Sequence, residues 1–241
     1  MIIPQPKQYN LLSILSSKDR IYLNNITHCY NQYASEPCVS QFNPSNETLY
    51  LRLCEFYNRK KPIIVHFIDY YKHIPDFQQL NIDDQVGLVK ENIRYLLPIN
   101  YALLKTPEQS KFRYAKIQTI DCYENTNLHY LYAYLSNQFV PLVAYDSLMI
   151  KLVLIILFFS TNSNELKQWN VVQMIQTNYL NLLWTYMLDK YGENQARCLF
   201  MNIIMKYLHL QQVIEQIDFV IRSNECIDQL DELLKSVLQL T

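Results

Sequence analysis

Apolar residues recur at the three- and four-residue spacing of helices over most of this chain. In the first third, the pattern predicts helices over residues 17–30, 48–57 and 62–73. Pro62 either starts or kinks the third of these helices. The polar, proline-containing residues 34–47 are the expected loop between the first two.

The rest of the chain continues the helical periodicity. It predicts a central helix that begins at Ile82, and further helices over residues 145–159, 169–191, 193–221 and 227–238. Strand-like character is confined to residues 105–127, where one short β-hairpin is expected from Phe112, Tyr114, Ile117 and Ile120. No repeat, linker or low-complexity tract divides the chain, so we expect one all-α domain.

Composition narrows the class of protein. Lysine and arginine total 21 against 22 acidic residues, so no overall basic field exists to hold nucleic acid. The two glycines are too few for a glycine-rich phosphate loop, and the six cysteines form no C-x-x-C pair. The five histidines are scattered, so we expect no metal, cofactor or enzymatic activity. The apolar run 148–159 is shorter than the roughly 20 residues of a membrane-spanning helix, so we expect no membrane partner.

One stretch carries a specific motif. Residues 77–90 read Phe-x-x-Leu-x-x-x-Asp-Gln-x-x-Leu-Val-Lys. This pattern resembles the signature of nuclear-receptor ligand-binding domains. Residues 146–162 are similar to the seventh helix of that family, and residues 172–210 to its eighth through tenth. The resemblance therefore extends from about residue 17 to the C-terminus.

The resemblance implies a three-layer antiparallel helical sandwich of about 11–12 helices with one short β-hairpin. It implies a single domain over residues 1–241, with a flexible segment at 1–16 and a mobile activation helix at 227–241. Such a domain binds a lipophilic small molecule and recruits coregulators through Leu-x-x-Leu-Leu helices. It regulates transcription in the nucleus, in some cases shuttling with the cytoplasm. DNA is contacted only through a separate domain that is not in this chain.

In this family the coregulator helix lies in an apolar groove, and opposite charges hold its two ends. By position, Lys72 is the lysine that caps the last carbonyls of the peptide, and Glu232 is the glutamate that accepts from its first amides. The resemblance places the rest of the groove at Ile64, Ile68, Gln85, Val86, Val89 and Lys90. Without the family, these aliphatic residues would be ordinary core and Lys72 a solvated surface charge.

The last helix allows more than one interpretation. Residues 229–234 fit the family's activation motif with one polar substitution, which selects Glu232 as its acidic residue. Residues 230–234 also read Leu-x-x-Leu-Leu, so a second hypothesis places this helix in its own groove, where it competes with partners. The plainest alternative is an amphipathic helix that packs against the domain.

The resemblance also implies an internal ligand pocket. Its lining is expected from Phe56, Arg59, Lys60, Ile63, Phe67, Leu97 and Leu104. Many family members hold an acidic or phenolic ligand group with an arginine at the position of Leu104, which leaves Arg59, Lys60 or Lys105 as the basic candidate here. The 20 tyrosines and 10 phenylalanines offer an alternative, a filled pocket and an orphan receptor that is independent of ligand.

Dimer partners are also implied by position. The face of a homodimer, or of a heterodimer with another nuclear receptor, is expected at Tyr207, Leu210, Val213 and Phe219, although such a stripe is at least as often core. Tyr95 stands where heterodimerising members carry glutamate, which leaves the partner open. A helical interaction domain of another family, without any pocket, is the remaining alternative.

Overall fold

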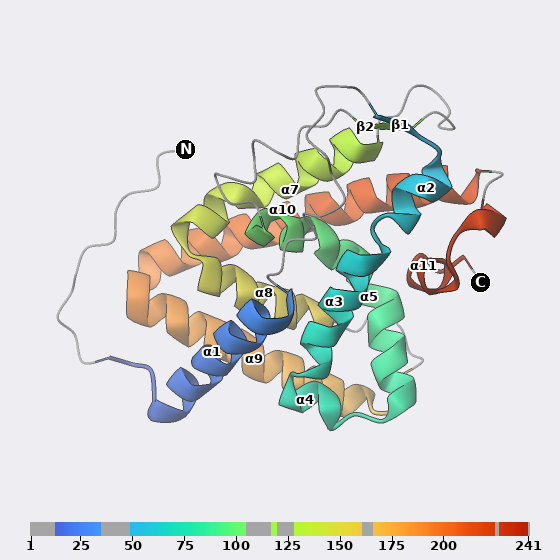
Figure 1. Cartoon of the computed structure of the whole chain (residues 1–241). Coiled ribbons are helices and arrows are strands. Elements are labelled where there is room, and N and C mark those ends of the chain that lie inside the picture. The colour runs from blue at the N-terminus through green and yellow to red at the C-terminus, as the bar shows by residue number, and fades with distance from the viewer. Residues whose placement is uncertain are drawn as a thin grey trace.

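Helices form nearly all of the chain that the computed structural model describes, namely residues 13–34, 49–104, 117–119, 128–160, 166–224 and 227–240. The helices are α1 (Ser17–Cys29), the π-helical η1 (Tyr30–Ala34), α2 (Leu53–Asn58), α3 (Lys61–Lys72), α4 (Pro75–Gln78), α5 (Ile82–Leu104), α7 (Leu128–Tyr145), α8 (Ser147–Phe158), α9 (Trp169–Tyr191), α10 (Glu193–Arg222), the short 3-10 helix η4 (Ile227–Gln229) and α11 (Glu232–Val237) (Figure 1). The expected all-α class is confirmed. No helix within these ranges is both long and apolar enough to cross a membrane.

Local sequence signals set several helix ends. Ser16 caps α1, because its hydroxyl accepts from the Asp19 backbone N–H while the Asp19 carboxylate accepts from the Ser16 N–H. Pro62 lies in the first turn of α3, so it starts that helix and does not kink it. Gly192, with a φ of 74°, makes the turn between α9 and α10 in a backbone region that favours glycine.

The described part of the N-terminal segment, from residue 13 onward, is hydrogen-bonded to the rest of the domain. Residues 1–12 of the expected flexible segment lie outside the described residues. The Ile14 backbone N–H donates to Asp189 of α9 at 2.5 Å, and the Ser13 hydroxyl donates to the same carboxylate at 3.2 Å. The end of this segment is therefore attached to α9.

The short strands differ from expectation. β1 (Leu49–Leu51) occupies the start of the predicted 48–57 helix and pairs in parallel with β2 (Ile117–Thr119). Ile117 is thus a strand residue, but its described partner is Leu49. Phe112, Tyr114 and Ile120 lie outside the described residues, so the β-hairpin stays a prediction.

Helix α7 is an element that the apolar periodicity does not predict. It packs against α5, α8 and α10, and its residues Leu135, Phe139 and Leu142 are completely buried. Because several helices surround it, apolar residues occupy more than one of its faces and no clean amphipathic stripe results.

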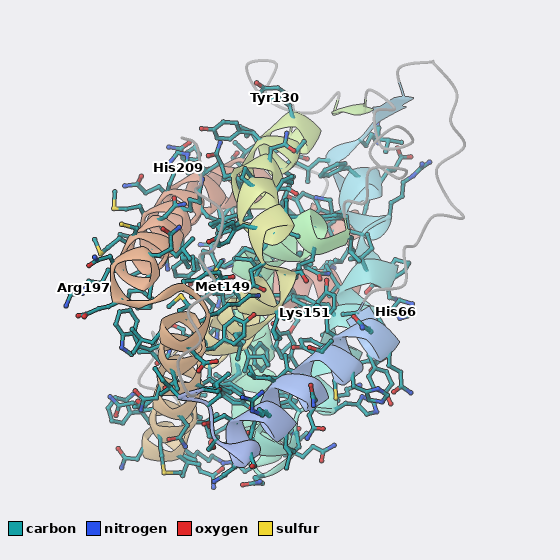
Figure 2. All side chains as sticks on the ribbon, turned by 90° about the vertical axis from the view of Figure 1, so that its left-hand side faces the viewer. His66, Tyr130, Met149, Lys151, Arg197 and His209 are labelled. Atoms are coloured by element: carbon teal, nitrogen blue, oxygen red, sulfur yellow. The ribbon has the colours of Figure 1, made fainter. Side chains whose placement is uncertain are left out.

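The core centres on α8. This helix is buried at nearly every position and contacts α1, α5, α7 and α9. Figure 2 shows Met149 of α8 in the middle of the packed helices, whereas Tyr130 and Arg197 project outward.

A buried carboxylate joins α8 to the end of α9. Asp146 caps α8 by accepting from the Leu148 backbone N–H at 3.0 Å, and it also accepts from the hydroxyls of Tyr186 at 2.7 Å and Tyr191 at 2.5 Å. The Lys190 ammonium donates to it at 2.9 Å. Burial alone would raise the pKa of Asp146, but these hydrogen bonds lower it below its ordinary value.

Asp146→Ala is expected to destabilise the fold by about 3 kcal/mol and to lower Tm by roughly 10 °C, because it removes a helix cap and leaves buried donors without an acceptor. The matched control is Asp83→Ala, which removes the exposed Lys167–Asp83 pair and should change stability by less than about 1 kcal/mol. Urea unfolding and thermal melts measure both changes. Equal losses in the two variants would contradict a structural role for the Asp146 cluster.

Candidate functional site

The Asp-Gln pair of the sequence motif holds the start of α5 in place. Asp84 is buried, and its carboxylate accepts from the backbone N–H groups of Lys167 at 2.7 Å and Gln168 at 2.8 Å, just before α9. The Gln85 amide donates to the backbone carbonyls of Phe77 at 3.1 Å and Leu80 at 2.9 Å. The two side chains therefore satisfy backbone groups within α4, just after α4 and just before α9, and Gln85 is engaged there instead of being free for a peptide.

Helix α3 and the first half of α5 lie beside each other, with α4 at one end (Figure 1). We call their exposed and half-buried aliphatic residues the α3–α5 surface: Val65, Ile68, Ile82, Val86 and Val89. Val86 is 45% exposed, whereas Ile68 and Val89 are partly buried against the core. These three predicted groove residues therefore lie, exposed or partly buried, on two helices that contact each other.

The family resemblance did not predict two residues of the α3–α5 surface, Val65 and Ile82. It also assigned Ile64 to this surface, where Ile64 does not belong. Val65 is 38% exposed and Ile82 is 68% exposed. Ile64, by contrast, is only 2% exposed, so it is a core residue. Neighbouring positions on a helix point about 100° apart, so a register error of one residue exchanges a core position for a surface position.

The basic residues of the predicted groove are exposed. Lys72 is the last residue of α3, its side chain is 59% exposed, and its ammonium contacts Asp69 at 3.0 Å. Lys90 of α5 is exposed as well. Exposed ion pairs contribute little stability, so Lys72 can exchange Asp69 for the carbonyls of a bound helix at low cost.

Helix α11 is docked by contacts with the junction of α2 and α3. Asp231 caps α11 by accepting from the Leu233 backbone N–H at 3.0 Å, and the Lys61 ammonium donates to the same carboxylate at 2.6 Å. The hydrogen bond from Lys61 lowers the pKa of Asp231. Asn58 adds two bonds, accepting from the Asp231 N–H at 3.0 Å and donating to the Gln229 carbonyl at 3.1 Å.

Two of the three leucines of residues 230–234 are buried, and Leu233 is half-buried. Leu230 is 3% exposed, Leu234 is completely buried, and α11 packs against α5. Val86 and Ile82 of α5 remain exposed. The hypothesis that the last helix fills the α3–α5 surface stays a prediction. Glu232 stays available, because its side chain is 82% exposed and contacts only Lys235, at 2.8 Å, within the described chain.

Most of the predicted pocket residues are buried. The buried members are Phe56, Lys60, Phe67, Leu97 and Leu104. Ile63 is half-buried and Arg59 is exposed, so Arg59 faces away from the interior. Lys105, the third basic candidate, lies outside the described residues. Of the two candidates that the structure describes, Lys60 is buried and Arg59 is exposed.

Aromatic rings surround the Lys60 ammonium. Its Nζ lies 3.3 Å from the centre of the Tyr132 ring and 4.1 Å from that of Phe56, with Tyr57 at 5.3 Å and Tyr101 at 6.0 Å. Lys60 is 8% exposed, and Nζ has no hydrogen-bond partner among the residues that the structure describes. Burial lowers the pKa of Lys60 well below its ordinary value of 10.5.

The predicted dimer face is divided between core and surface. Leu210 is completely buried and Val213 is 8% exposed, so these two residues pack inside the domain. Tyr207 is partly buried, and Phe219 is 75% exposed. The exposed apolar residues of α10 are Met201, Met205, Leu208 and Phe219. Their spacings of four, three and eleven residues place them along one stripe of the helix.

Within the described chain, no group of three or more His, Cys, Asp or Glu side chains is arranged to hold a metal ion. In comparisons with known proteins, no family model matches the chain and no curated sequence matches it.

Lys60→Met is expected to stabilise the ligand-free domain at pH 7 by about 1 kcal/mol or more. Burying an unpaired ammonium costs several kcal/mol, whereas cation–π contacts return only about 2 kcal/mol. Because the pKa of Lys60 is lower in the folded chain than in the unfolded chain, the unfolded chain binds more protons between that lowered pKa and 10.5, and across this window the penalty grows as the pH falls.

The difference in unfolding free energy between Lys60→Met and the wild type should therefore narrow as the pH rises from 7 towards 10.5. Urea titrations at several pH values measure this difference. The tyrosines that titrate in this range are present in both proteins, so their contribution cancels in the difference. A gap that is constant or widens with pH would contradict an unpaired, buried Lys60.

Proposed function

We propose that this chain is a nuclear-receptor ligand-binding domain that acts in the nucleus, where it binds Leu-x-x-Leu-Leu helices of coregulators on the α3–α5 surface. The observation that carries the proposal is the placement of charge around this surface. A basic residue, Lys72, lies at the last turn of α3, and an exposed acidic residue, Glu232, lies next to Asp231, which bonds Lys61 at the first turn of α3. Val65 of α3 and Ile82 and Val86 of α5 are exposed aliphatic residues of these two helices.

The separation of the two ends suits a short helix. Lys61 and Lys72 are the first and last residues of α3, and eleven helical steps span about 16 Å. A two-turn Leu-x-x-Leu-Leu helix is about 11 Å long, which leaves room at each end for one side chain to reach its terminus. An acidic side chain at its N-terminus and a basic one at its C-terminus match the helix macrodipole.

The ligand half of this proposal has two versions. In the first, a lipophilic small molecule occupies the interior beside Phe56, Lys60 and Phe67. In the second, the receptor is independent of ligand because aromatic side chains fill that space. The second version is favoured by the stacking of buried rings, such as Tyr71 on Phe158 with centroids 3.6 Å apart.

The three-layer helical sandwich is part of the same proposal. This arrangement is supported by the packing of α8, which contacts α1, α5 and α9. Dimerisation is proposed through the exposed stripe of α10, with a second copy or another nuclear receptor as the partner. A helical interaction domain without a pocket is the alternative if no ligand binds.

Lys72→Ala is expected to weaken binding of a fluorescent Leu-x-x-Leu-Leu peptide by about tenfold or more, because a hydrogen bond to a charged group contributes about 1.5–3 kcal/mol. Glu232→Gln should weaken binding in the same direction. Fluorescence anisotropy measures both affinities.

Lys18→Ala is the control for this experiment, because it removes an exposed lysine from α1, away from the α3–α5 surface. Its affinity should equal that of the wild type. Unchanged peptide affinity in Lys72→Ala and Glu232→Gln would overturn the proposed clamp.

Met205→Glu is expected to raise the dimer Kd of the domain by about tenfold or more, because it would place a charge in the apolar stripe of α10 at an isologous interface. Size-exclusion chromatography with light scattering measures the monomer fraction. The control is Ile21→Glu, at an exposed apolar position on α1. A wild type that is monomeric, or a variant that dimerises like the wild type, would refute a homodimer through α10.

A further inference from the structure

Helix α9 carries almost no charge along its length. Residues 168–188 include no acidic, basic or histidine residue, although charged residues make up 18% of the chain. Helix α10, which packs beside α9, differs, because Glu193, Arg197 and Glu215 are exposed on it. Solvated helix faces usually carry charges, whereas the centre of a protein interface is depleted of them. The composition of α9 is therefore typical of a surface that another protein covers.

The exposed residues of α9 lie on one side of the helix. At 100° per residue they all project within about 60° of the direction of Thr177, which is at the centre of this side. We call them the α9 face: Asn170, Gln173, Met174, Thr177, Leu180 and Asn181. Met174 is 57% exposed and Leu180 is 37% exposed. In Figure 1, α9 runs along the lower side of the domain, with α8 between it and α7.

The α9 face has a nearly symmetric sequence about Thr177. Three residues before and after Thr177 are the apolar Met174 and Leu180, and four residues before and after it are the amides Gln173 and Asn181. When two copies of a helix pair antiparallel about a twofold axis, residues at equal distances before and after the central residue come to the same level. The symmetry of the α9 face is therefore the symmetry that such self-pairing requires.

We propose that α9 is a self-association surface that pairs antiparallel with α9 of a second copy of this chain, with Thr177 at the twofold axis. Each of the two equivalent layers beside the axis then contains Gln173 and Met174 of one copy and Leu180 and Asn181 of the other. The apolar side chains pack together in the layer, and each amide supplies both a donor and an acceptor for the other.

The charges at the two ends of α9 favour the antiparallel orientation. Lys167 precedes the uncharged residues and is exposed, whereas Asp189 follows them and is half-buried. Antiparallel pairing about Thr177 brings Lys167 of one copy to within about 3 Å of the level of Asp189 of the other, because the offset is two helical steps. Parallel pairing would instead bring like charges together at each end, which is unfavourable.

The size of the α9 face makes this pairing weak. A face about 30 Å long and 10 Å wide covers roughly 300 Å² per copy, compared with about 800 Å² per partner in a standard interface. The association is therefore transient and depends on protein concentration. It uses a different helix from the proposed dimer face on α10, so either surface can fail without the other.

A disulfide can trap this transient pair. In a background with Cys198→Ser, which removes an exposed thiol, Thr177→Cys places a thiol at the twofold axis. Helices packed about 8–10 Å apart bring facing Cα atoms to about 4–6 Å, which is within the range of a disulfide. Copper–phenanthroline with dissolved oxygen serves as the oxidant. Non-reducing gel electrophoresis measures the cross-linked fraction, and mass spectrometry of the peptides identifies the bond.

Asn170→Cys in the same background is the matched control, since it lies on the same exposed face. In the antiparallel pair its two copies are about 21 Å apart along the axis, which is too far for a disulfide. Thr177→Cys is expected to cross-link at least about tenfold faster than Asn170→Cys. Equal rates in the two variants, including no cross-linking in either, would overturn the proposal, because random collision or parallel pairing does not distinguish these positions.

A charge on the α9 face provides a second test. Leu180→Glu, added to Thr177→Cys, is expected to slow cross-linking by about tenfold, because it places a carboxylate among apolar and amide side chains of the second copy. Ile21→Glu, at an exposed position on α1, should leave the rate unchanged. Far-UV circular dichroism establishes that each variant is folded. An unchanged rate in Leu180→Glu, or an equal loss in Ile21→Glu, would contradict pairing through α9.

Discussion

The packing of α5 is the constraint on which both candidate sites depend. This helix contacts α3, α7, α8, α10 and α11, and most of its residues after Glu91 are buried. Its first turns carry Val86 and Val89 to the α3–α5 surface, and its last turns carry Tyr101 to Lys60. Asp84 fixes the start of the helix by bonding the segment before α9. A displacement of α5 would therefore alter the α3–α5 surface and the aromatic rings around Lys60 together.

The buried charged side chains differ in whether a described partner compensates their charge. Asp146 has three side-chain donors, and Asp218 is paired with Arg94 at 2.7 Å between side chains that are each 11% exposed. Such pairs leave no uncompensated charge, and breaking them is costly. Lys60 has no partner of this kind among the described residues, so we expect it to reduce the stability of the fold at neutral pH.

Motif and periodicity predicted the helical class, the start of α5 and the exposure of Lys72 and Val86. They did not predict that Ile64, Leu210 and Val213 are core residues, because an apolar residue on a helix has the same spacing whether it faces a neighbouring helix or a partner. Helix α7 was not predicted because it is apolar on several faces. The cage around Lys60 could not be derived from sequence alone, since its rings come from elements far apart in the chain.

We propose that the α3–α5 surface binds a coregulator helix, and this binding can be observed directly. Methyl-detected NMR of the chain, with labelled isoleucine and valine, can follow a titration with a Leu-x-x-Leu-Leu peptide. We expect the largest shift changes at the methyl groups of Val65, Ile68, Val86 and Val89, with little change at Ile21 on α1. Changes concentrated on α10 around Ile203 and Ile204, or no saturable change at all, would contradict it.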